Sequence, residues 1–135
     1  NTMSIWSDIQ DRSSGETVRK EDQQIGLEIK EIKQKVKSAA KQYVEGYIDA
    51  MFDSGSSVKE IQEQQKWDFM DVETYHIVDR MEKVDQDRFW ELQDHFWDLD
   101  EEYNLGEEID LEDYAQGMLR HFANKLIPAL KEEMS

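Results

Sequence analysis

A regular recurrence of apolar residues between positions 25 and 52 constrains the fold of this chain more than any other feature. The recurrence alternates steps of three and four residues, and it comprises Ile25, Ile29, Ile32, Val36, Ala39, Ala40, Tyr43, Val44, Tyr47, Ile48, Met51 and Phe52. This spacing places the side chains along one face of an α-helix, which has about 3.6 residues per turn. The pattern stops at Ser54, Gly55 and Ser56, so we predict one long amphipathic helix that begins at Ile25 and ends there.

Two shorter helices are expected next. Ser57 and Glu60 have the spacing of a capping box, in which each side chain accepts a hydrogen bond from the other residue's backbone N–H. A helix should therefore begin directly after Ser57. Asp71 would cap the following helix. The apolar face of that helix comprises Val72, Tyr75, Val78 and Met81, and the joint before it contains Trp67, Phe69 and Met70.

The region after position 84 predicts a helix with one aromatic face and one acidic face. Asp85 or Asp87 would open this helix, and Asn104 with Gly106 would end it. Its apolar side chains are Phe89, Trp90, Leu92, Phe96, Trp97, Leu99 and Tyr103. Because Trp90 and Trp97 are seven residues apart within this pattern, we expect both in the core.

A last helix should begin after Asp110, whose side chain would cap it. Pro128 would cause a kink or a restart, because proline lacks the N–H and clashes with the preceding turn. These patterns together predict an all-α fold. We expect a single-domain irregular bundle of four to five helices over residues 25–135, preceded by an arm with a short helix over residues 1–24.

Charge excludes several classes of partner. The formal net charge is −16, and residues 85–113 contain 13 acids and one base, Arg88. Such a chain should not bind nucleic acid or an anionic membrane directly, because phosphates attract clustered Lys and Arg. No apolar stretch reaches the about 20 residues of a membrane span. The absence of cysteine is compatible with a reducing compartment, so we expect a cytoplasmic protein.

No motif in the sequence predicts catalysis. The chain has no GxSxG, no P-loop glycines and no dinucleotide fingerprint. His76, His95 and His121 are dispersed and lack the spacing of metal ligands. We therefore expect a protein that is not an enzyme and that needs no cofactor.

One pattern of carboxylates leaves an enzymatic alternative open. Glu60 and Glu63 have ExxE spacing, and Glu82 and Asp85 follow with ExxD spacing. This layout resembles the magnesium site of the all-α nucleotide pyrophosphatases, in which carboxylates from neighbouring helices hold the metal. The resemblance implies a Mg²⁺-dependent enzyme that acts on nucleotide triphosphates. Such spacings also arise by chance here, because 32 of the 135 residues are acidic.

The acidic segment favours binding to another macromolecule. Many carboxylates in a short segment repel one another, and an acidic helical surface can imitate the phosphates of a nucleic acid. In size, helical pattern and acid-lined helices, the chain is similar to the phage-encoded DNA-mimic inhibitors of restriction and related defence enzymes. The resemblance implies a basic nucleic-acid-binding protein as the partner. The carboxylates expected to contact it are Asp94, Asp98, Asp100, Glu101, Glu102, Glu107, Glu108 and Asp113.

Three other interpretations of the surface stay open. A run of charge often serves only to keep a small protein soluble. The chain can instead be a protein-protein adaptor that uses exposed aromatic side chains, because Trp and Tyr are enriched at binding hot spots. A homodimer is the third, formed either by the long helix or by Arg12, Arg19 and Lys20 of the arm docking on the acidic segment of a second copy.

Overall fold

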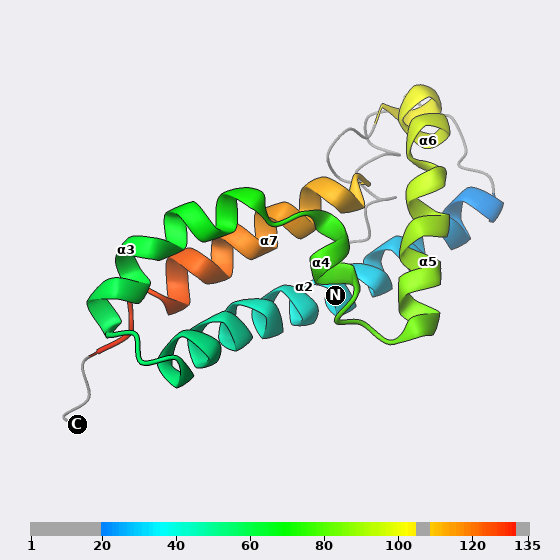
Figure 1. Cartoon of the computed structure of the whole chain (residues 1–135). Helices are drawn as coiled ribbons and strands as arrows, with labels where there is room; N and C mark the ends of the chain where they lie inside the picture. The colour runs from blue at the N-terminus through cyan, green and yellow to red at the C-terminus, as the bar shows by residue number, and fades with distance from the viewer. Residues whose placement is uncertain (1–19, 105–108, 132–135) are drawn as a thin grey trace. The chain divides into compact units, whose positions relative to one another are not determined.

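The computed structural model describes residues 20–104 and 109–131, and these residues are almost entirely helical (Figure 1). They form six α-helices and one short 3-10 helix, with no strand, which confirms the predicted all-α class. None of the described helices combines the length and the apolar character that crossing a bilayer requires. The elements are α2 (Lys20–Asp53), α3 (Val58–Asp68), η1 (Phe69–Asp71), α4 (Thr74–Val78), α5 (Lys83–Asp94), α6 (Phe96–Tyr103) and α7 (Leu111–Leu126).

The described residues divide into two compact units. Unit 1 contains those up to Lys35 together with Glu82–Tyr114, and unit 2 contains Val36–Met81 together with those from Ala115 onward. The chain contributes to each unit twice because α2 and α7 each supply residues to both. Each unit has its own buried side chains, such as Phe89 and Leu99 in unit 1 and Val44 and Leu119 in unit 2.

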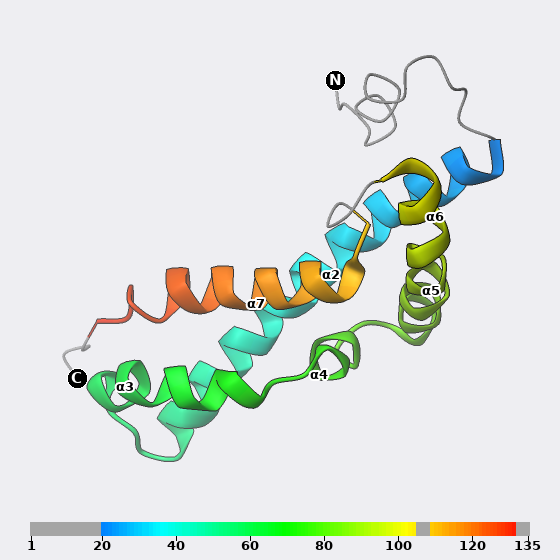
Figure 2. The same ribbon diagram turned by 90° about the horizontal axis from the view of Figure 1, so that it is seen from above.

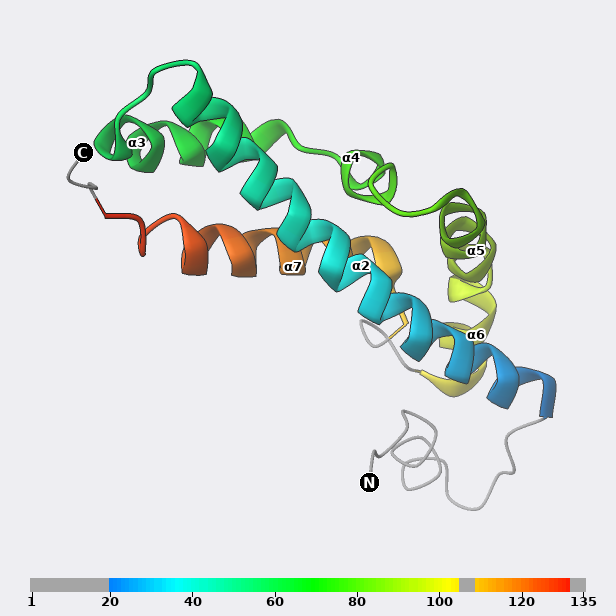
Figure 3. The same cartoon turned by 90° about the horizontal axis from the view of Figure 1, so that it is seen from below.

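Helix α2 is the long amphipathic helix that the apolar recurrence predicts, and Figure 3 shows it as one continuous helix. It begins at Lys20 and thus includes residues 20–24 of the expected arm, whereas residues 1–19 of that arm lie outside the described residues. Its end is closed by two backbone bonds, from Gly55 N to Phe52 O (3.0 Å) and from Ser56 N to Met51 O (2.9 Å). Gly55 has a φ of 92°, the left-handed conformation that this closure needs and that glycine adopts without strain.

In unit 1, the predicted helix after position 84 is two helices, α5 and α6, separated at His95. The break arises because His95 N bonds Leu92 O, three residues back, and this tightens the turn. Glu82 occupies the N-cap position of α5, so the prediction that Asp85 or Asp87 would cap this helix is wrong. Helix α6 ends as predicted at Asn104, which is left-handed with a φ of 55°, and Gly106 lies outside the described residues.

The tryptophans of α5 and α6 do not lie in the core. Phe89, Leu92 and Leu99 are buried, whereas Trp90 is 38% exposed and Trp97 is 75% exposed, so the prediction that both tryptophans are core residues is wrong. The cause is the angular position of each side chain on the helix. At about 100° per residue, position 90 points away from positions 89 and 92 of α5, and position 97 lies on the side opposite to position 99 of α6.

Unit 2 confirms the capping box of α3. Ser57 N donates to Glu60 Oε1 at 2.8 Å, and Glu60 N donates to Ser57 Oγ at 3.1 Å. Helix α4 begins after Glu73 rather than after Asp71, which is part of η1, so the predicted Asp71 cap is wrong. Its first turn is closed instead by His76, whose Nδ1 accepts a hydrogen bond from Glu73 N at 2.9 Å.

Helix α7 begins as predicted after Asp110, whose Oδ1 accepts a hydrogen bond from Asp113 N at 3.2 Å. It ends at Leu126, so Pro128 causes neither a kink nor a restart. The reason is steric, because a proline ring disfavours helical conformation in the residue before it. In unit 2, α7 lies beside α3 (Figure 2), and Gln62 Nε2 donates to Ile127 O at 3.0 Å.

Candidate functional site

The structure places the predicted contact acids on three kinds of position. Asp94, Asp98 and Glu101 are exposed on α5 and α6. Asp100 and Glu102 also belong to α6 and make further contacts there. The remaining three are elsewhere: Asp113 is exposed in the first turn of α7, and Glu107 and Glu108 lie outside the described residues.

A set of exposed side chains on α5 and α6 combines acids with the two tryptophans. Its five residues are Asp87, Trp90, Asp94, Trp97 and Glu101, and all of them are exposed. They recur at steps of three and four, so within each helix they lie on the side opposite to its buried residues. His95 separates the two helices and keeps a right-handed backbone conformation. We call these five residues the tryptophan–acid stripe.

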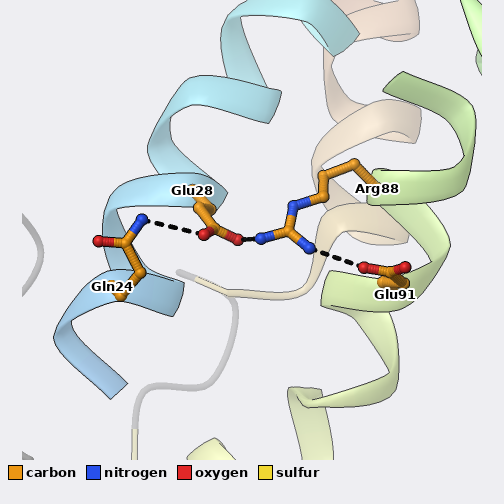
Figure 4. Close-up of polar contacts among 4 residues, drawn as sticks. All are labelled: Gln24, Glu28, Arg88 and Glu91. Atoms are coloured by element: carbon orange, nitrogen blue, oxygen red, sulfur yellow. Dashed lines mark hydrogen bonds and ion pairs between the residues drawn. The ribbon is translucent and has the colours of Figure 1, made fainter. Parts of the chain in front are cut away.

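An arginine fixes α5 against the first part of α2 within unit 1. Arg88 pairs with Glu28 of α2 and also donates from Nη1 to Glu91 Oε1 at 2.6 Å (Figure 4). Gln24 Nε2 donates to the other oxygen of Glu28 at 2.9 Å. A second ion pair joins Lys35 Nζ to Asp85 Oδ2 at 3.8 Å. The one base of the acidic segment therefore serves to hold the helix that carries the stripe.

Two neutral side chains, Gln93 and Tyr103, make further contacts that hold α5 and α6, and no sequence pattern indicated these contacts. Gln93 of α5 donates from Nε2 to Asp110 Oδ1 at 3.0 Å and accepts from Leu111 N at 2.8 Å, so it joins α5 to the start of α7. Tyr103 of α6 donates to Asp22 of α2 at 2.6 Å, and both residues are buried. These contacts join residues far apart in the sequence, which explains why no local pattern predicts them.

Two tyrosines have raised pKa values. The pKa of Tyr47 is raised first by burial, then by its 2.5 Å hydrogen bond to Asp68 Oδ2 and by the charge of that carboxylate. Burial raises the pKa of Tyr114, whose ring lies under the Lys33 ammonium at 5.1 Å from its centroid. Both phenols stay protonated at neutral pH, so neither is available there as a general base.

The four carboxylates of the magnesium alternative are divided between the two units. Glu60 and Glu63 belong to α3 in unit 2, whereas Glu82 and Asp85 belong to unit 1. Glu60 accepts a bond within its capping box, and Asp85 pairs with Lys35. Among residues 20–104 and 109–131, no three His, Asp or Glu side chains are placed to hold a metal ion. The geometry therefore gives this alternative no support.

The described surface most suited to recognition is thus the tryptophan–acid stripe, held in place by Arg88 and Gln93. A comparison of the chain with protein-family models, with curated protein sequences and with solved structures found no match.

Proposed function

We propose that this protein acts by binding another protein through the tryptophan–acid stripe, and that the partner presents a basic surface of the kind that binds nucleic acid. One observation carries the proposal: α5 and α6 expose both tryptophans together with several acids, while Phe89, Leu92 and Leu99 of the same helices are buried. Exposed apolar surface rimmed by polar residues is typical of protein-protein interaction sites, and tryptophan is enriched at their hot spots.

The carboxylates supply attraction over a distance. Asp98 adjoins the stripe on α6 and is exposed, so Asp94, Asp98 and Glu101 together present three acids to a partner. Lysines and arginines that normally contact phosphates would pair with them. Complementary charge speeds the encounter of two proteins, and it does so most strongly at low salt.

The tryptophans supply a second candidate function, because imitation of phosphates needs carboxylates alone. Trp97 is 75% exposed and Trp90 is 38% exposed, which is the observation that favours an adaptor. Tryptophan is among the residues whose truncation most often weakens a complex, by about 2 kcal/mol or more at a hot spot. Nucleic-acid mimicry and the adaptor are separated by which side chains the partner needs.

The test uses a variant that removes three negative charges from the face: Asp94→Asn, Asp98→Asn and Glu101→Gln. A matched control removes three exposed acids from α2, through Glu45→Gln, Asp49→Asn and Asp53→Asn. Each tagged protein is incubated with lysate from the source cells at low salt. Bound proteins are identified by mass spectrometry, and duplex DNA is then added to the captured complexes.

For mimicry, the wild type and the control retain a nucleic-acid-binding protein that added DNA displaces, and the three-charge variant loses it. The association rate with the purified partner should fall at least about tenfold as salt rises. Retention by the three-charge variant together with loss in Trp97→Ala supports the adaptor instead. A partner retained by both variants means that this face is not the binding surface.

A further inference from the structure

A groove in unit 2 has a chemistry opposite to that of the tryptophan–acid stripe. It lies between α3 with η1 on one side and α7 on the other, which run side by side (Figures 1 and 2), and it has a volume of about 350 Å³. Lys66, Met70 and Arg120 are exposed residues in its lining, and buried Leu119 lies in its lining as well. The groove therefore combines two cations with an apolar surface.

The cations of this groove are available to a ligand. The Lys66 ammonium lies 5.6 Å from the centroid of the Trp67 ring, and neither Lys66 nor Arg120 forms a salt bridge with any described residue. The sequence from position 114 to 131 contains no acid, although the chain as a whole has 32. The α7 side of the groove thus attracts carboxylates without competing acids nearby in sequence.

An exposed methionine gives the groove a preference for ligands with aromatic rings. Met70 is 70% exposed, which is high for an apolar side chain. Its flexible thioether adapts to irregular partners and makes favourable contacts with aromatic rings. The guanidinium of Arg120 can in addition lie over an indole face. The groove consequently fits a tryptophan that has acids on either side of it.

The chain itself carries such a segment. Trp97 and Glu101 are four residues apart on α6, about one helical turn, and Asp94 at the end of α5 is three residues before Trp97. We propose that the groove of one copy binds the tryptophan–acid stripe of a second copy, with Trp97 against Met70 and the two acids near Lys66 and Arg120. Charge complementarity favours this occupant, because the carboxylates of the stripe are opposite in charge to Lys66 and Arg120 of the groove.

This contact uses different surfaces on the two copies. A contact of that kind leaves one groove and one stripe unused at the ends, so it continues into open chains unless it closes as a ring. Self-association would also cover the stripe and compete with an external partner. The inference does not require that such a partner exists, since both surfaces belong to this chain.

The test uses two charge-reversed variants of the full chain. The groove variant carries Lys66→Glu and Arg120→Glu, and the stripe variant carries Asp94→Lys and Glu101→Lys. Sedimentation velocity at concentrations up to about 1 mM covers weak interfaces as well as strong ones. Circular dichroism checks that each variant keeps its helices. Val84→Ala, at an exposed apolar residue of α5, is the control for surface substitution.

The wild type should form species larger than a dimer as its concentration rises, and each variant alone should stay monomeric. An equimolar mixture should form a one-to-one complex, because each variant retains the surface that the other has lost. Trp97→Ala should weaken self-association at least about tenfold. A monomeric wild type, a mixture that does not associate, or association that persists in both variants would overturn the proposal.

The experiment separates this inference from the proposed function. The groove variant keeps the stripe intact, so it should bind an external partner at least as well as the wild type does. Failure of self-association with retained capture of a partner overturns only the inference. Self-association without any captured partner overturns only the proposed function.

Discussion

Unit 1 and unit 2 use their charged residues in opposite ways. Residues 85–113, all from unit 1, contain 13 acids and one base, whereas residues 114–131, all but Tyr114 from unit 2, contain no acid and three bases. A cavity of about 410 Å³ in unit 1 is lined by Glu28, Lys35, Asp85 and Arg88, which already form ion pairs with one another. The groove of unit 2 is lined by Lys66 and Arg120, which form no salt bridge among the described residues.

The difference shows which charged side chains hold each unit together and which are left exposed. In unit 1, the bases hold α5 against α2, and the acids are left for the surface. In unit 2, hydrogen bonds join the helices, as in the bonds from Gln62 to Ile127 O, from Gln116 to Val72 O (3.2 Å) and from Tyr47 to Asp68. Paired charges in unit 1 are structural, and the cations of the unit 2 groove are available for recognition. Substitutions can test this contrast.

The largest effect is expected from the core beneath the stripe. Phe89 is completely buried in α5, and Phe89→Ala should lower the free energy of unfolding by about 3–5 kcal/mol, because it leaves a cavity. Val84→Ala on the same helix should change it by less than about 0.5 kcal/mol, since Val84 is 69% exposed. Urea denaturation followed by circular dichroism measures both. Equal effects would show that α5 is not packed as described.

A smaller loss is expected from the ion pair. Arg88→Met removes the partner of Glu28, whose side chain is only 18% exposed, and should cost about 2 kcal/mol. Adding Glu28→Gln should recover most of that loss, because the unpaired charge is then gone. Lys66→Met in unit 2 should be nearly neutral. If Lys66→Met costs as much as Arg88→Met, the contrast between structural and available charges is incorrect.

Replacing two glycines by alanine should change the free energy of unfolding by about 1 kcal/mol in opposite directions. Gly55→Ala in the turn after α2 should destabilise unit 2, because its φ of 92° strains any side chain. Gly117→Ala within α7 should stabilise the protein, since a methyl group there meets no atom within 4 Å and alanine favours helix. Thermal denaturation gives the sign of each change. A stabilised Gly55→Ala variant would rule out the described turn.

The smallest expected effect is on the stability of the protein at alkaline pH. The pKa of Tyr47 is raised above its ordinary value of 10.0 in the folded state, so the folded protein retains this proton longer than the unfolded chain does. The resulting stability is fully present below pH 10 and is lost as pH rises through the raised pKa. Tyr47→Phe should therefore flatten the loss of stability above pH 10, seen in urea midpoints at several pH values. An unchanged slope would argue against the Tyr47–Asp68 bond.

Local patterns determined much of this fold. The spacing of apolar residues predicted α2 within five residues at its start, because one helical face recurs every three to four positions. The hydroxyl of Ser57 and the carboxylates of Glu60 and Asp110 marked two helix starts, since capping depends only on residues within one turn. The acidic segment was also visible in the sequence.

Tertiary structure decided which of the candidate residues lie at the surface. Trp90 and Trp97 looked like core residues, but only the packing of Phe89, Leu92 and Leu99 shows which side of α5 and α6 is covered. The roles of Arg88 and Gln93 likewise depend on partners 60 and 17 residues away in sequence. The groove lined by Met70 forms only because α3 and η1 lie beside α7. Sequence fixes what each helix can bury, and contacts between distant segments determine what it does bury, because burial is a property of pairs of elements.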